Sequence, residues 1–172
     1  MKLAYDEVLT ELETSGIISE VPEAELDCDR PYYLPHRPVV RDGSSTTRVR
    51  PVFDASAKGS NGVSLNDCLE AGPSLNPNLV DVLVRFRRWK IGFASDLSKA
   101  FLQLLLRPAD RDVHRFLWQV NGTLRVMRFN RVTFGVNCSP FLLKATVQHH
   151  LRLYDQGSNA VRELQTNLYV DD

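Results

Sequence analysis

The segment Ile91-Gly92-Phe93-Ala94-Ser95-Asp96-Leu97-Ser98-Lys99-Ala100-Phe101 is the most informative part of this sequence. It opens with a short apolar run of strand length, follows a helix-like segment, and reaches a single carboxylate at Asp96. We therefore predict a buried strand that delivers Asp96 at the edge of a sheet, where a carboxylate is suited to bind a metal ion. Aspartate is also a favoured helix N-cap, so the local alternative is that Asp96 caps an element beginning at Leu97.

Length and composition indicate one domain, or one domain with a poorly separated lobe, with an ordinary hydrophobic core. The chain has 172 residues, of which 43% are hydrophobic, and its 21 Lys and Arg residues balance 21 Asp and Glu residues. This balance neither requires nor excludes a nucleic-acid partner, because clustered acids can lie beside basic grooves.

The cysteines and the lengths of the apolar runs indicate the cellular compartment in which the protein is expected. Cys28, Cys68 and Cys138 form no CxxC pair, which disfavours a disulfide framework or zinc site and favours a reducing environment. No apolar run approaches the roughly 18 residues of a membrane helix, and the first residues lack the apolar core of a signal peptide. We therefore expect a soluble intracellular protein with no membrane partner.

Periodicity predicts an α+β fold with antiparallel strands and flanking helices. Helices are expected over 5–14, from an Asn76 N-cap onward, from a Ser139 N-cap to about 153, and over 157–166. Hairpins are expected over 32–40 with 48–53, and over 114–120 with 123–129 around Asn121-Gly122. A loop over 57–77 contains one turn at 65–69.

Two basic clusters have both structural and functional interpretations. Arg37 and Arg41 precede the turn-rich connection 42–47, and Arg48 and Arg50 follow it. They could protect a solvated sheet edge or contact phosphates from a flap, and the sequence leaves both open. The basic residues that end the helix after Asn76 suit its negative dipole end, although nucleic-acid contact is a further option.

A glycine and a pair of adjacent carboxylates stand out towards the C-terminus. Gly135 precedes the expected helix start at Ser139 and suggests a backbone that comes close to a flat or large group. The sequence ends Leu168-Tyr169-Val170-Asp171-Asp172, a short β-prone run with adjacent carboxylates. Such like charges need a cation or water, and the local alternative is a solvated tail.

These motifs together resemble the reverse transcriptase domain of retroelements, most closely that of BEL/Pao-type long-terminal-repeat retrotransposons. The resemblance runs from about Tyr5 to Asp172. A Tyr-x-Asp-Asp motif alone is weakly diagnostic, whereas the ordered combination is specific. The motifs are Arg50-Pro51-Val52-Phe53-Asp54-Ala55-Ser56-Ala57-Lys58, Ser64-Leu65-Asn66-Asp67, Asp96-Leu97-Ser98-Lys99-Ala100-Phe101, Phe134-Gly135-Val136-Asn137-Cys138-Ser139-Pro140 and Tyr169-Val170-Asp171-Asp172.

The resemblance implies an RNA-directed DNA polymerase that adds deoxynucleotides (dNTPs) to a primer 3′-hydroxyl on an RNA or DNA template. It implies that Asp96, Asp171 and Asp172 are the catalytic metal-binding acids, with the Leu97 carbonyl as a further ligand. The expected cofactor is a pair of Mg²⁺ ions about 4 Å apart, with Mn²⁺ as a substitute. Mg²⁺ prefers hard oxygen ligands, which carboxylates provide.

The resemblance also implies the residues that contact the incoming nucleotide and the template–primer. Arg50 would lie on the triphosphate, where charge-assisted hydrogen bonds are strong, and Ala100 would offer its backbone N–H to it. Phe101 would be a steric gate that excludes a ribose 2′-hydroxyl. Phe134 and Gly135 would complete the nucleotide site, and Tyr169, Ser139 and Pro140 would contact the template–primer.

By the same resemblance, residues 1–75 and 108–138 form the fingers, and residues 76–107 and 139–172 form part of the palm. In relatives the Tyr-x-Asp-Asp motif lies at the bend of a hairpin. The return strand of the palm, the thumb and the ribonuclease H domain would therefore lie outside this chain, and we expect little or no activity from the chain alone. The expected setting is a cytoplasmic retroelement particle.

Two departures and two alternatives accompany this interpretation. Lys99 stands where some relatives carry an acid, and no residue clearly replaces the first finger lysine, although Arg41 or Arg48 could. A non-catalytic nucleic-acid-binding remnant of a retroelement would use Arg37, Arg48, Arg50 and the basic end of the helix after Asn76. It would bind in a salt-sensitive, metal-independent way. A purely structural domain would bind neither Mg²⁺ nor template–primer.

Overall fold

The computed structural model describes residues 1–40 and 49–169, and the chain divides into two compact units. Unit 1 comprises Met1–Leu69 and Phe101–Asn137, whereas unit 2 comprises Glu70–Ala100 and Cys138–Asp172. Each unit is therefore assembled from two separate stretches of the chain. The assignment of these bodies to fingers and palm stays a prediction.

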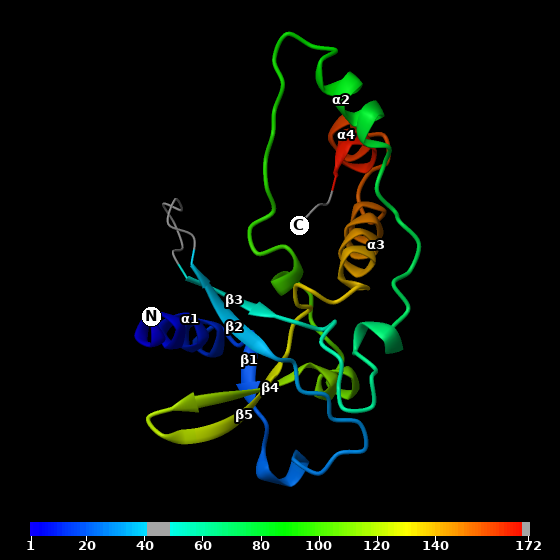
Figure 1. Cartoon of the computed structure of the whole chain (residues 1–172). Coiled ribbons are helices and arrows are strands. Elements are labelled where there is room, and N and C mark those ends of the chain that lie inside the picture. Colours follow the sequence, from blue (N-terminus) through cyan, green and yellow to red (C-terminus); the bar gives the residue numbers. More distant parts are fainter. Residues whose placement is uncertain (41–48, 170–172) are drawn as a thin grey trace. The chain divides into compact units, whose positions relative to one another are not determined.

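Unit 1 contains one long helix and two antiparallel sheets (Figure 1). The three-stranded sheet has the order β1-β5-β4, and β2 pairs with β3. This mixture of helices and antiparallel strands confirms the predicted α+β class. The elements are α1 (Lys2–Thr14), β1 (Ile18–Glu20), β2 (His36–Val40), β3 (Val49–Phe53), β4 (Arg115–Val120) and β5 (Thr123–Phe129).

The hairpin of β4 and β5 forms as the sequence predicted. Its register aligns Val120 with Thr123 at the turn and Arg115 with Arg128 at the open end. Asn121 and Gly122 both have positive φ angles, 50° and 83°, as a two-residue type I′ turn requires. The predicted hairpin of β2 and β3 also forms, although its tip, with Arg41 and Arg48, lies outside the described residues.

The core of unit 1 lies where α1 packs against the sheets. Leu9 of α1 and Phe116 and Met127 of the three-stranded sheet have no solvent exposure. The burial of Leu9 follows from the helical spacing of the apolar residues in α1, which turns one face of this helix towards the sheets. Arg125 ties the helix to this sheet through ion pairs of 2.5 Å to Glu13 and 2.7 Å to Glu20.

The described residues of unit 2 form three helices, which begin at different residues from those predicted. Asn78, rather than Asn76, caps α2, because its side chain accepts a hydrogen bond from the Val80 N–H at 2.9 Å. The N-cap of α3 is Cys138, so Ser139 is the first helical residue. The helices are α2 (Leu79–Phe86), α3 (Ser139–Leu151) and α4 (Asn159–Asn167).

The predicted buried strand before Asp96 is wrong. Residues 92–97 have no regular secondary structure, and Ile91 and Phe93 are 70% and 91% exposed. A strand needs a neighbour for its backbone N–H and C=O groups. Both sheets of the described residues belong to unit 1, so this segment has no described strand partner.

The remaining connections are short helical turns and loops. The predicted turn at 65–69 is the 3₁₀ helix Asn66–Cys68, and further 3₁₀ helices lie at Glu23–Glu25, Phe101–Gln103, Pro108–Asp110 and Asp112–His114. All three cysteines are free thiols. Within residues 1–40 and 49–169, no helix is long and apolar enough to cross a membrane.

Candidate active site

Asp96 lies on unit 2, in an exposed segment that turns immediately afterwards. The turn Ser98–Ala100 contains Lys99 in the left-handed region, at φ 51°. No helix starts at Leu97, because the next helical residue is Phe101. The capping alternative for Asp96 is therefore excluded, and the chain turns at residues 98–100 instead.

The carboxylate of Asp96 is available to a ligand. Asp96 is exposed and forms no hydrogen bond or ion pair with the described part of the chain. Its free oxygen lone pairs fit the hard-ligand preference of Mg²⁺. Asp171 and Asp172 lie outside the described residues, and among residues 1–40 and 49–169 no three His, Cys, Asp or Glu side chains gather closely enough to hold a metal ion.

Phe101 and Phe134, both predicted at the nucleotide site, meet in unit 1. Their ring centroids are 5.0 Å apart with an interplanar angle of 88°, a T-shaped arrangement that aromatic pairs prefer. Phe101 is 4% exposed, whereas Phe134 is 53% exposed. The Phe134 ring therefore lies at the surface and packs against the buried Phe101 ring.

Gly135 comes close to the end of a strand in its own unit, whereas the sequence suggested approach to a flat or large group. A Cβ atom on Gly135 would lie 2.8 Å from the Phe53 carbonyl oxygen at the end of β3, and Gly135 has a φ of +82°. Both features require glycine. Gly135 thus fixes the loop that carries Phe134 against β3.

Asn66 and Asn137 join three of the sequence motifs, a role that the sequence did not predict. The backbone N–H of Asn66 donates to Ala55 O at 3.0 Å, and its side-chain amide donates to Gly135 O at 3.0 Å. Asn137 donates from its backbone to Asn66 Oδ1 at 2.9 Å and from its side chain to Asn66 O at 2.8 Å. These motifs therefore fold as one hydrogen-bonded body.

Replacing Gly135 by alanine should destabilise the protein more than replacing Gly122 by alanine. Both glycines have φ near +80°, but a Cβ on Gly122 would meet nothing within 4 Å. The left-handed strain of about 1–2 kcal/mol is common to both variants, whereas the contact with Phe53 belongs to Gly135 alone. Urea denaturation of Gly135→Ala and Gly122→Ala measures the difference. Equal losses of unfolding free energy would show that the close approach costs nothing.

The other predicted site residues fall on both units. Arg50 of β3 is exposed and pairs with Val39 in the sheet register, and it forms no ion pair with the described residues. On unit 2, Ala100 is half-buried, Pro140 is exposed and Tyr169 is 38% exposed. Ser139 is 2% exposed, so its side chain offers little surface to a template–primer in this structure.

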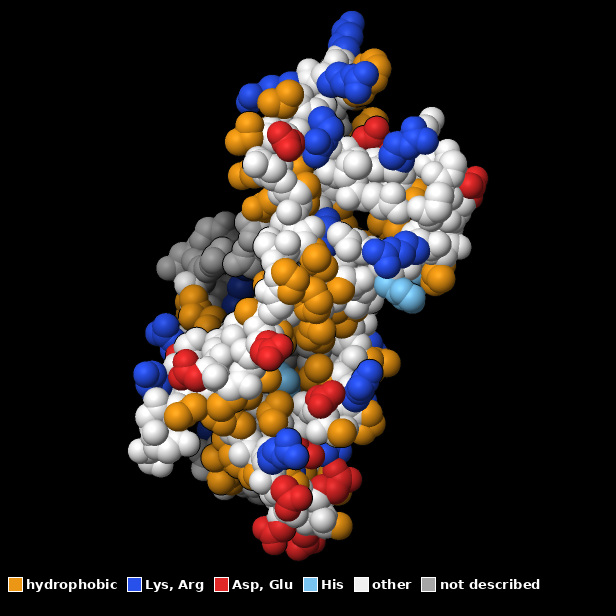
Figure 2. Space-filling model, turned by 90° about the vertical axis from the view of Figure 1, so that its right-hand side faces the viewer, with side chains coloured by type: hydrophobic (Ala, Val, Ile, Leu, Met, Phe, Trp, Pro, Cys, Tyr) orange, Lys and Arg blue, Asp and Glu red, His pale blue; other side chains and the backbone are white. Residues whose placement is uncertain are grey.

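The end of α2 carries basic and apolar groups together. Figure 2 shows Lys and Arg side chains beside hydrophobic ones at the upper tip, over this helix end. Arg88 lies over the Trp89 ring at 5.1 Å, a cation–π distance. Beside it is a hollow of about 450 Å³ within unit 2, lined mainly by apolar side chains, including Phe86, Trp89, Ile91, Phe93 and Leu164.

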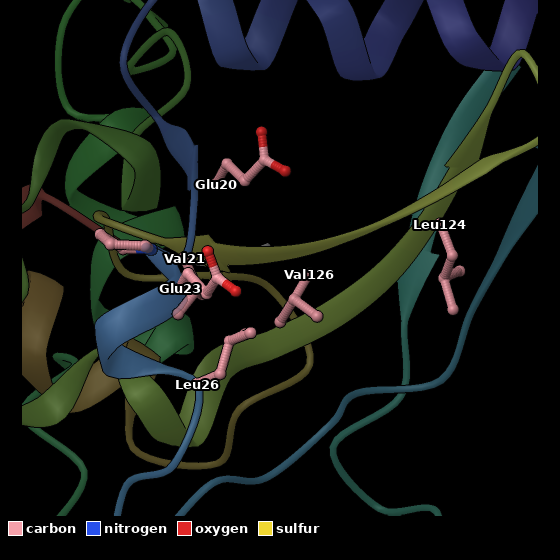
Figure 3. Close-up of a pocket in the computed structure, with 7 residues that line it drawn as sticks. Glu20, Val21, Glu23, Leu26, Leu124 and Val126 are labelled. Carbon is pink, nitrogen blue, oxygen red and sulfur yellow. The ribbon is translucent and has the colours of Figure 1, made fainter.

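A second hollow, on unit 1, is unsuited to a nucleotide. It has a volume of about 450 Å³ and lies beside β1 and β5 (Figure 3). Val21, Leu26 and Val126 form an apolar floor, and the carboxylates of Glu20 and Glu23 stand at its rim. Glu20 is already paired with Arg125, and no Lys or Arg of the described residues lines this hollow to hold a triphosphate.

Comparisons with known proteins identify the fold. Two solved structures of the prototype foamy virus protease-reverse transcriptase, a selenomethionine-labelled mutant and the native protein, match with TM-scores of 0.65 and 0.64. Each is 20% identical in sequence, covering 90% and 88% of this chain, and this chain spans 18% of each matched chain. No protein-family model and no curated protein matches the sequence. The chain therefore has a reverse-transcriptase-like fold.

Proposed function

We propose that this chain is the fingers and part of the palm of an RNA-directed DNA polymerase, from a BEL/Pao-type long-terminal-repeat retrotransposon. In this proposal the parent polypeptide adds dNTPs to a primer 3′-hydroxyl on an RNA or DNA template. The observation that carries the proposal is the meeting of Phe101 and Phe134. These residues come from separate motifs, both expected at the nucleotide, and they form one aromatic pair within a reverse-transcriptase-like fold.

The proposed catalytic groups are those that the resemblance to reverse transcriptases implies. Asp96, the Leu97 carbonyl, Asp171 and Asp172 would hold two Mg²⁺ ions, or Mn²⁺ in their place. When bound, these ions supply Lewis-acid stabilisation of the attacking and leaving oxygens. Asp96 suits this role because its carboxylate is exposed and unpaired within the described part of the chain.

The remaining residues would bind and orient the nucleotide. The Arg50 guanidinium would donate charge-assisted hydrogen bonds to the triphosphate, and its exposed position on β3 leaves it accessible. The Ala100 N–H would contact the same group. Phe101 would be the steric gate against a ribose 2′-hydroxyl; in this structure its ring is 4% exposed and packs against the exposed Phe134 ring.

Primer extension tests the proposal. This chain is compared with the polypeptide extended through the sequence encoded after Asp172, on an RNA template with Mg²⁺ and dNTPs. We expect the extended polypeptide to lengthen the primer and this chain alone to add little or nothing. If the extended polypeptide is folded, binds template–primer in a salt-sensitive way and adds no nucleotide, the proposal fails and the non-catalytic binding remnant replaces it.

Replacing Phe101 by alanine should relax sugar selection. A rigid apolar gate can discriminate against an added hydroxyl by about 10²-fold, so we expect ribonucleotide use relative to deoxynucleotide use to rise by about tenfold or more. The measurement is the ratio of kcat/KM for the two nucleotides in the extended polypeptide, and it corrects for any general loss of activity. An unchanged ratio would contradict the gate assignment.

A further inference from the structure

The hollow beside β1 and β5 on unit 1 combines apolar walls with an acidic rim (Figure 3). Its lining includes Leu124, which is 61% exposed. The rim residue Glu23 is also exposed, and it forms no ion pair with the described residues. The same holds for Asp27 and Asp29 in the segment that follows, which ends at the cation Arg30. This site, called the acidic hollow below, suits an apolar group that has positive charge beside it.

The acidic hollow is preformed, because hydrogen bonds fix its walls. The Val21 N–H donates to Val126 O at 2.8 Å. The buried guanidinium of Arg115 donates to Leu26 O at 2.8 Å and to Glu25 O at 2.5 Å. A preformed site binds without the free-energy cost of ordering its walls. Its volume of about 450 Å³ lies within the range of pockets that hold small organic ligands, so one aromatic side chain fits.

The segment that follows α2 on unit 2 offers the complementary chemistry. Trp89 and Phe93 are 69% and 91% exposed. Arg87, Arg88 and Lys90 are exposed beside them and form no ion pair with the described residues. Exposed apolar groups that gather in this way mark interaction sites, and Trp and Arg are enriched among the residues that dominate binding energy. Residues 87–93 are called the basic aromatic tip below.

Two copies of this chain can bring the two surfaces together without opposing net charge. The chain has 21 Lys and Arg residues and 21 Asp and Glu residues, so the copies do not repel one another as a whole. Contact of tip with tip, or of hollow with hollow, would place like charges together at a cost in free energy. Contact of tip with hollow pairs opposite charges. Charge complementarity therefore favours a head-to-tail contact between copies.

We propose that the basic aromatic tip of one copy docks in the acidic hollow of a second copy. Trp89 of the tip lies against Leu124 and Val126 of the second copy, and the cations of the tip face Glu23 and the acids that follow it. Because the two surfaces differ, the contact is heterologous, and the rotation between copies decides whether it closes into a ring. The inference goes beyond the polymerase proposal and does not depend on it.

Sedimentation equilibrium of this chain measures the self-association. We expect the mean mass to rise with protein concentration at about 0.1 M salt and to rise less at about 1 M, where the screening length falls from about 10 Å to about 3 Å. Trp89→Glu and Leu124→Lys should each weaken association by about 30-fold or more, as changes at a dominant contact do. Leu153→Glu and Leu3→Lys, which make the same charge changes at other exposed positions, should not. A chain that stays monomeric at every concentration would overturn the inference.

Mixing the two variants tests the head-to-tail contact itself. The Trp89→Glu chain keeps its hollow and the Leu124→Lys chain keeps its tip, so an equal mixture can form one intact contact. We expect pairs of chains in the mixture and monomers in each variant alone. Recovery in the mixture also shows that both variants are folded. A mixture that associates no better than its components, while both keep the circular dichroism of the unaltered chain, contradicts the inference.

Single-stranded RNA is the other partner that a basic segment with an exposed aromatic ring can bind. The acidic hollow separates the two partners, because only docking of a second copy uses it. We therefore expect Leu124→Lys to weaken self-association as strongly as Trp89→Glu does. A monomeric chain that binds labelled single-stranded RNA, and loses this binding with Trp89→Glu, would assign the tip to nucleic acid and overturn the inference.

Discussion

Asp96→Asn should reduce nucleotide addition by the extended polypeptide by about 10³-fold or more while leaving its folding almost unchanged. A bound metal ion contributes several kcal/mol of transition-state stabilisation, and each 1.36 kcal/mol corresponds to a tenfold change in rate. Asparagine keeps the size of the side chain but removes the charge that a divalent cation needs. We therefore expect the rate of nucleotide addition to fall even when every polypeptide is bound to template–primer.

The surroundings of Asp96 explain why stability should survive this change. Asp96 is exposed, caps no helix and forms no hydrogen bond or ion pair with residues 1–40 and 49–169. Asp81→Asn is a matched control, because Asp81 is an exposed carboxylate in the first turn of α2, in the same unit. Single-turnover primer extension and urea denaturation measure the two effects. Comparable rates for Asp96→Asn and Asp81→Asn would remove Asp96 from the catalytic site.

Arg115→Met should destabilise the protein by about 3–5 kcal/mol, the usual cost of removing one partner from a buried ion pair. Arg115 has no solvent exposure. Its guanidinium donates to Leu26 O at 2.8 Å and Glu25 O at 2.5 Å, and pairs with Asp112 at 2.9 Å. Methionine would leave the Leu26 and Glu25 carbonyls without this donor, and backbone carbonyls cannot move away easily. Asp112 would keep its ion pair with Arg128 at 3.2 Å.

Arg107→Met provides the control for this prediction. Arg107 is exposed, and its side chain forms no hydrogen bond with the described residues. Urea denaturation of the whole chain should therefore show a large loss of unfolding free energy for Arg115→Met. For Arg107→Met the unfolding free energy should change by no more than about 0.5 kcal/mol. Equal small losses would mean that solvent or neighbouring donors replace the Arg115 contacts.

The role of Arg115 could not be predicted from the sequence. An arginine at the start of a strand normally indicates an exposed edge, and its partners here are backbone carbonyls about 90 positions earlier in the chain. The ion pair of Glu25 with Arg128 at 2.5 Å likewise joins residues 103 positions apart. Side-chain contacts to distant backbone leave no periodic pattern in the sequence.

Features with a local physical cause were predicted well. The turn Asn121-Gly122 requires two positive φ angles, which these residue types provide, and the apolar spacing of α1 specifies its buried face. Helix starts were less accurate because Asn76 and Asn78 flank Pro77 and both can act as caps. Asn78, the residue directly before the apolar stripe, is the actual cap.

The candidate site was predicted from motif order, and the structure describes part of it. Phe101 and Phe134, both predicted at the nucleotide, form an aromatic pair, and Gly135 approaches the Phe53 carbonyl, which the sequence did not indicate. The strand before Asp96 was wrong because an apolar run of strand length gives no information about its partner strand. Asn66 and Asn137 were recognised only as motif members, since the hydrogen bonds between them depend on the folded loop. The roles assigned to Asp171 and Asp172 stay predictions.

The most direct measurement of the central claim is single-nucleotide addition by the extended polypeptide as a function of Mg²⁺ concentration. With a labelled primer on an RNA template, we predict a product that appears with Mg²⁺, disappears on chelation, and returns when Mg²⁺ or Mn²⁺ is restored. A folded polypeptide that binds the template–primer and gives no product at any concentration of either ion would contradict the assignment of this chain to a DNA polymerase.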